Sequence, residues 1–129
     1  MTEAAFQIKF SHWAKAKFKG SGAFELKLVK NSKSLPFSTV KDHQLAALTA
    51  ANSTEQGLFW KIMDCGYINP MDSFIIRNTP AYIVVQFWKP REKIFYMIPV
   101  KNFIAERYSS RRKSLTEERA LAIGIKCSL

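Results

Sequence analysis

Glu25 and Lys27 alternate with apolar residues in a short segment of the sequence, residues 23–30. Such alternation is typical of a strand, in which residues two apart lie on one face, about 6.5 to 7 Å from each other. Metal-dependent hydrolysis of a phosphodiester requires hard oxygen ligands at one point, and usually a cation near the attacking water or the scissile phosphate. On this strand Glu25 can ligate a metal while Lys27 reaches the bound water or phosphate. Alternating Glu and Lys are also typical of a solvated face, so the pair alone is a weak signal.

A polar side chain, Gln44, falls on the apolar face of a predicted helix. Ser38 is a plausible N-cap for a helix that extends to about Ala51. Within that helix Gln44 is four residues from both Val40 and Leu48, so the spacing predicts that its amide faces inward. Such an amide either bonds to backbone in the core or belongs to a site.

The order of three segments resembles the PD-(D/E)XK nuclease superfamily, and specifically its Holliday junction resolvase branch, with RecU-like and archaeal Hjc-like members and phage-encoded ones. The three segments are Phe24-Glu25-Leu26-Lys27, Ser34-Leu35-Pro36-Phe37 and His43-Gln44. The resemblance covers residues 23–51 well and extends more loosely over residues 81–106. It implies an α/β fold with a restriction-endonuclease-like mixed β-sheet flanked by helices, in a single domain of residues 1–129.

The resemblance also implies an activity and a role for each site residue. The activity would be a Mg²⁺-dependent, structure-selective DNA endonuclease, for which Mn²⁺ can substitute, acting as a homodimer on branched DNA and above all on Holliday junctions. Glu25 would be a metal ligand, Lys27 the catalytic lysine, and Gln44 a helix residue that points into the site. His43 lies a quarter turn round the helix, so we expect it to contact solvent or DNA.

The aspartate that precedes E-x-K in this family is missing, because residues 1–24 contain no Asp and only one acid, Glu3. We expect the missing ligand to be Asp72, which stands just before an apolar strand, in a hairpin that would have to lie beside the Glu25 strand. Asp64, on the other side of the same turn, is the second choice, and Glu3 is a weaker further candidate. For both aspartates the alternative is a turn-forming Asp that bonds to its own backbone.

The charge of the chain indicates an anionic partner. The sequence has 20 Lys and Arg against 10 Asp and Glu, a formal net charge of +10. A field of this sign attracts polyanions, among which nucleic acid is the commonest and an anionic membrane surface is the rival. Contacts to phosphates position a duplex without reading its sequence, which suits recognition of branched shape. The candidate DNA contacts are Lys15, Lys17, Lys19, Lys30, Lys33, Lys41, Arg111, Arg112 and Lys113.

The elements that must position these residues are predicted from hydrophobic spacing and turn signals. Thr2 can cap a first helix that ends near residue 18. Strands are predicted at residues 58–62, 73–76, 81–88 and 94–98, and Ser114 to Glu117 forms a capping-box pattern that opens a last helix. No segment has transmembrane length, and the two cysteines lack the spacing of a zinc site. We therefore expect a soluble, cytoplasmic α/β protein without a membrane partner.

Two other functions remain open at this stage. One is a PD-(D/E)XK nuclease with another DNA substrate, either restriction-like or replication-associated. The other is a non-catalytic basic DNA-binding module, which the missing upstream aspartate favours. Cleavage assays with a four-way junction and a linear duplex separate the three.

Overall fold

The computed structural model of the 129-residue chain describes every residue except 32, 64, 65, 67 and 69. Asp64, the second candidate for the missing aspartate, therefore lies outside the described residues. The elements in chain order are α1 (Glu3–Lys17), β1 (Ala23–Val29), β2 (Ser34–Pro36), the 3-10 helix η1 (Phe37–Thr39), α2 (Asp42–Asn52), β3 (Leu58–Lys61), β4 (Ser73–Ile76), β5 (Ala81–Phe87), β6 (Ile94–Pro99), α3 (Val100–Ser109), β7 (Ser114–Thr116), α4 (Glu117–Ile123) and β8 (Ile125–Ser128).

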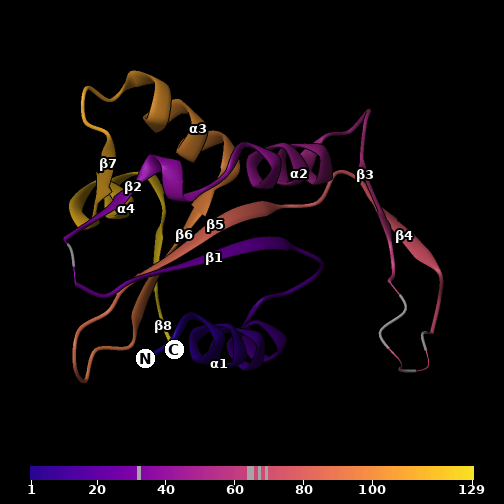
Figure 1. Cartoon of the computed structure of the whole chain (residues 1–129), viewed down its shortest axis with the longest axis horizontal. Helices are drawn as coiled ribbons and strands as arrows, with labels where there is room; N and C mark the ends of the chain where they lie inside the picture. Colours follow the sequence, from indigo (N-terminus) through magenta and orange to yellow (C-terminus); the bar gives the residue numbers. More distant parts are fainter. Residues whose placement is uncertain (32, 64–65, 67, 69) are drawn as a thin grey trace.

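The centre of the molecule is a four-stranded mixed sheet with the strand order β1-β5-β6-β8. β1 runs parallel to β5, whereas β6 is antiparallel to both β5 and β8. Helix α1 lies against one face of the sheet, and α2 and α3 lie on the other (Figure 1). The predicted α/β class, with a mixed sheet between helices, is confirmed.

The central strand β5 is apolar on both faces because helices cover both of them. Ile83 and Val85 pack into a core shared with α2 and α3. Val84 points the opposite way, into a smaller core with Phe6 and Phe10 of α1. The predicted first helix and its cap are confirmed, since the Thr2 hydroxyl accepts a hydrogen bond from the Ala5 N–H at 3.1 Å.

Two predicted helix starts are wrong. Val40 has an extended backbone (φ −87°, ψ 108°), so Phe37–Thr39 forms only a 3-10 turn and α2 begins after its N-cap, Lys41. The strand Ser114–Thr116 takes the place of the second predicted cap, because these residues pair with β2. Thr116 caps α4 instead, accepting a hydrogen bond from the Arg119 N–H at 3.2 Å. The short strand β8 was not predicted.

The predicted hairpin forms, but not at the predicted place. β3 and β4 pair with each other as a separate antiparallel two-stranded sheet. This hairpin projects from the body of the molecule, well away from β1 (Figure 1). The expectation that it lies beside the Glu25 strand is therefore wrong for the described residues. It exposes the apolar side chains of Phe59, Trp60, Met63, Ile68, Met71, Phe74 and Ile75.

Candidate active site

The Glu25 carboxylate is the point on which the predicted site residues converge. Its Oε1 atom accepts a hydrogen bond from the Gln44 amide Nε2 at 3.0 Å. The Lys27 ammonium lies 3.4 Å from the same oxygen. The structure thus brings together three of the four residues for which a catalytic role is predicted.

Strand alternation explains why Glu25 and Lys27 share this place. Leu26, between them, packs toward α1, and Val29 packs into the core beneath α2. Because successive side chains of a strand point to opposite faces, Glu25 and Lys27 face α2. The Lys27 side chain is only 11% exposed and that of Glu25 27%. The ammonium is therefore largely removed from water and depends on Glu25 for its counter-charge.

The amide of Gln44 is held at one end by the start of α2 and at the other end by Glu25 of β1. The Gln44 Oε1 accepts a hydrogen bond from the Lys41 N–H at 3.0 Å, and the Gln44 Nε2 donates to Glu25. Gln44 is thus the N3 residue of a capping box, which satisfies an N–H at the start of the helix. The inward direction predicted from Val40 and Leu48 is right, although Val40 lies outside the helix.

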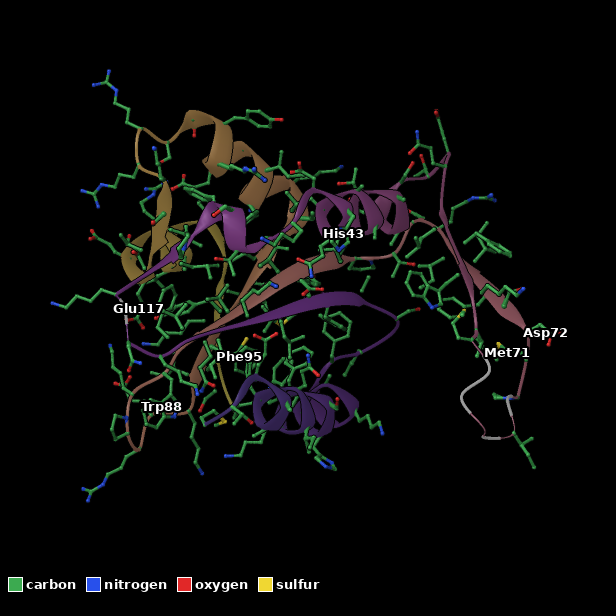
Figure 2. All side chains as sticks on the ribbon, viewed as in Figure 1. His43, Met71, Asp72, Trp88, Phe95 and Glu117 are labelled. Atoms are coloured by element: carbon green, nitrogen blue, oxygen red, sulfur yellow. The ribbon has the colours of Figure 1, made fainter. Side chains whose placement is uncertain are left out.

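The structure does not bring the other predicted metal ligands to Glu25. Asp72 is exposed on the projecting hairpin, far out from the sheet (Figure 2). Glu3 is exposed in the first turn of α1, which packs on the opposite face of the sheet from Glu25. Glu25 is therefore the one carboxylate at this place among the predicted ligands that the structure describes.

The donor set fits Mg²⁺ only together with a substrate. In the described part of the chain no group of three or more His, Cys, Asp or Glu side chains could hold a metal ion. Mg²⁺ at phosphoryl-transfer sites is commonly bound by one or two carboxylates, with phosphate oxygens of the substrate and water in the other positions. Glu25 can supply one such carboxylate. The residues do not form a cage that would hold the ion in the absence of DNA.

The predicted DNA contacts are exposed, and they come from four parts of the fold. Lys15, Lys17 and Lys19 lie on α1 and just after it, Lys30 and Lys33 between β1 and β2, Lys41 at the N-cap of α2, and the basic cluster Arg111, Arg112 and Lys113 between α3 and β7. Arg111 and Arg112 of this cluster line a polar hollow of ≈ 490 Å³, together with three serines and the acids Glu106 and Glu118. Positive charge is thus available on several sides of the molecule.

An ion-pair network near the sheet was not predicted from the sequence. Glu117 accepts hydrogen bonds from Lys89 at 3.0 Å and from the Tyr96 hydroxyl at 2.8 Å. Burial by itself would raise the pKa of Glu117, but these two hydrogen bonds, together with the positive charges of Lys89 and Lys126, outweigh it and hold the pKa below its ordinary value. Burial and the bond to Glu117 raise the pKa of Tyr96 to about 12. Only tertiary contact joins these residues, so the network has no sequence signature.

No protein-family model matches the chain, and no curated protein or solved structure is significantly similar to it. The resemblance to the resolvase branch therefore stays a prediction from the sequence. In the described residues no helix is both long and apolar enough to cross a membrane.

Proposed function

We propose that the chain is a metal-dependent, structure-selective DNA endonuclease that acts on branched DNA, with a Holliday junction as its main substrate. The observation that carries the proposal is the convergence of Lys27 and Gln44 on one carboxylate oxygen of Glu25. The connection of β1 through α2 to the parallel strand β5 supports it further. This order agrees with the E-x-K strand, the glutamine-bearing helix and the later strand in which the sequence resembles the family.

Each of the three residues has a distinct role in this proposal. Glu25 would bind Mg²⁺ jointly with a DNA phosphate, and Mg²⁺ or Mn²⁺ there would lower the pKa of bound water and offset phosphate charge. Lys27 supplies a fixed positive charge, held in a largely buried position, for the charge that develops on the phosphate. Gln44 orients the Glu25 carboxylate and is a positioning residue, because its amide is already bonded on both sides.

The proposed active form is a homodimer formed through the β3–β4 hairpin. Its exposed apolar side chains form the kind of surface that a protein partner normally covers. A symmetric dimer places two sites on one junction, which suits a pair of nicks. The projecting hairpin is also the route by which Asp72 of a partner subunit would reach Glu25. That arrangement would supply a second carboxylate beside Glu25, which the predicted ligands of the same chain do not provide.

The test is cleavage of a four-way junction and of a linear duplex of the same sequence, each with Mg²⁺ or with a chelator. We expect Mg²⁺-dependent nicking of the junction that Glu25→Gln abolishes. Glu55→Gln, which removes an exposed carboxylate elsewhere, is the matched control and should cut normally. Equal cleavage of both substrates would instead indicate a nuclease with another DNA substrate, and absence of any metal-dependent cleavage would reject the enzyme.

A second candidate function is a non-catalytic DNA-binding module. The observation that favours it is that the described residues include no group of three or more His, Cys, Asp or Glu side chains that could hold a metal ion. In that case the protein would bind the junction with and without Mg²⁺, and Glu25→Gln would not change the affinity.

A further inference from the structure

A pocket lies on the face of the sheet opposite to Glu25 and Lys27. Its volume is ≈ 610 Å³, and its walls come from α1, the end of β5 and the turn that leads to β6. Pockets of this volume take small organic ligands. None of the three residues of the candidate active site lines it. Whatever it binds is therefore independent of the Glu25 site.

The lining of the pocket includes a buried amide whose oxygen has no partner among the described residues. Gln86 is 1% exposed, and its Oε1 accepts no hydrogen bond from the described residues. Val84, two residues earlier, packs toward α1, so Gln86 faces the same way and lines the pocket. Buried amides are nearly always hydrogen-bonded, because an amide loses its hydrogen bonds to water on burial and needs protein partners to replace them. An amide offers a donor beside an acceptor, a pattern that complements the hydrogen-bonding edges of nucleobases.

Two tryptophans supply flat apolar surface to the pocket. Trp13 is held in place by Phe10, with ring centroids 5.7 Å apart, and by the edge of Phe95 at 4.9 Å. Trp88 is half-buried in the turn after β5, at the end of the molecule away from the hairpin (Figure 2). Its indole makes no ring contact with the other aromatic residues that the structure describes. A partly exposed indole that does not stack on another ring is a platform on which a nucleobase can stack.

The charge around the pocket is predominantly positive. The exposed cations Lys9, Lys17, Arg91 and Lys93 line it, and none of them pairs with an acid of the described residues. One acid, Glu92, is also part of the wall, 3.8 Å from Lys89. The surplus of cations suits a phosphate group.

We propose that this pocket binds a single unpaired nucleotide. The base stacks on Trp88 beside Trp13, its edge hydrogen-bonds to the Gln86 amide, and its phosphate lies among the cations. Trp88 also lines a neighbouring hollow together with Lys30 and Lys33. A strand that leaves the pocket would meet these two lysines, which were predicted as DNA contacts. The same chemistry would recognise a free nucleotide.

The test compares a short single-stranded oligodeoxyadenylate with an abasic oligomer of equal length, both in chelator, with binding measured by fluorescence anisotropy. Calorimetric titration with dAMP tests the free nucleotide. We expect the base-bearing strand to bind roughly tenfold more tightly than the abasic one, as base stacking on an aromatic residue provides. Trp88→Ala and Gln86→Leu should remove most of that difference. The controls are Tyr108→Ala, at an exposed aromatic residue, and Gln56→Leu, at an exposed glutamine.

Two further measurements separate effects on nucleotide binding from effects on folding. Gln86→Leu replaces a buried amide whose oxygen accepts no hydrogen bond from the described residues with an apolar side chain of similar size, so its melting temperature should be unchanged or higher. Glu25→Gln should leave nucleotide binding intact. A failure of the proposed cleavage activity can therefore be distinguished from a failure of nucleotide binding in this pocket. Binding that depends on Trp88 supports the proposal. If only the strand binds, the pocket takes a nucleotide within a DNA strand; if dAMP also binds, it takes a free nucleotide as well. Equal affinity for the base-bearing and abasic strands, with no binding of dAMP, overturns the proposal.

Discussion

Gln44 donates its amide N–H to the carboxylate of Glu25 across 3.0 Å, although the two residues are 19 positions apart in the chain. The bond joins the first turn of α2 to the outer strand of the central sheet. Since the other end of the same amide accepts the Lys41 N–H, the direction of the Glu25 carboxylate is set by how α2 begins.

Gln44→Ala should therefore impair catalysis more than stability. Removal of a residue that orients a metal ligand typically costs 10- to 100-fold in activity or metal affinity, and we expect a loss of about that size in junction cleavage. Loss of the capping contact should lower the free energy of unfolding by about 1 kcal/mol. Gln56→Ala, an exposed glutamine beyond α2, is the control. Unchanged cleavage by Gln44→Ala would remove Gln44 from the site.

The charge pair of Lys27 and Glu25 should show strong coupling in stability. Glu25→Gln leaves the largely buried ammonium without its counter-charge, and we expect it to lower the free energy of unfolding by about 1–3 kcal/mol. Lys27→Met should cost less, because the Glu25 carboxylate is the more exposed partner and keeps Gln44. The double variant should recover part of the loss of Glu25→Gln. Denaturant unfolding measures all three, and strict additivity of the two single variants would show that the pair contributes nothing.

The Glu117 network should give stability a dependence on pH at both extremes. The pKa of Glu117 is lowered in the folded protein, so its contribution is complete above about 4.5 and is lost as the pH falls through the lowered value. The pKa of Tyr96 is raised from 10.0 to about 12, so its contribution is lost as the pH rises across that interval. Melting temperatures should show Glu117→Gln flattening the acidic limb and Tyr96→Phe the alkaline limb. An unchanged acidic limb in Glu117→Gln would contradict the network's role.

The basic cluster Arg111, Arg112 and Lys113 should contribute electrostatic affinity for DNA. Replacement of all three by Gln should weaken binding of junction and duplex alike. Each lost phosphate contact lowers the dependence of log K on log salt by about 0.9, so the slope should fall by up to about 3. Binding titrations at several salt concentrations measure it, with Lys101→Gln on α3 as a control. An unaltered slope would mean that the cluster faces away from DNA.

The hairpin should hold two copies together and complete the site between them. Replacing Phe59 and Trp60 by Ser should convert the dimer to a monomer in sedimentation, whereas Tyr108→Ser, an exposed aromatic on α3, should not. If Asp72 acts across the interface, Asp72→Asn and Glu25→Gln chains should each be inactive and regain partial cleavage when mixed. Full cleavage by Asp72→Asn alone would show that Asp72 is not a ligand.

The sequence by itself determined the local relationships. Alternation on one strand places Glu25 and Lys27 on the same face, helical spacing turns Gln44 inward, and the composition gives a strongly basic domain. These features depend on neighbours a few residues apart, so backbone geometry alone fixes them. The α/β class follows from the same patterns.

Only the tertiary structure decided which distant groups meet. It joined Gln44 to Glu25 and separated Asp72 from both on a separate hairpin. It also placed Gln86, whose amide oxygen has no partner among the described residues, beside Trp88 in a pocket. In the sequence Gln86 is one polar residue in an apolar strand. Whether such a residue finds a partner depends on the helix that covers it, and hairpin placement depends on packing between elements remote in the chain. Neither is encoded in local spacing.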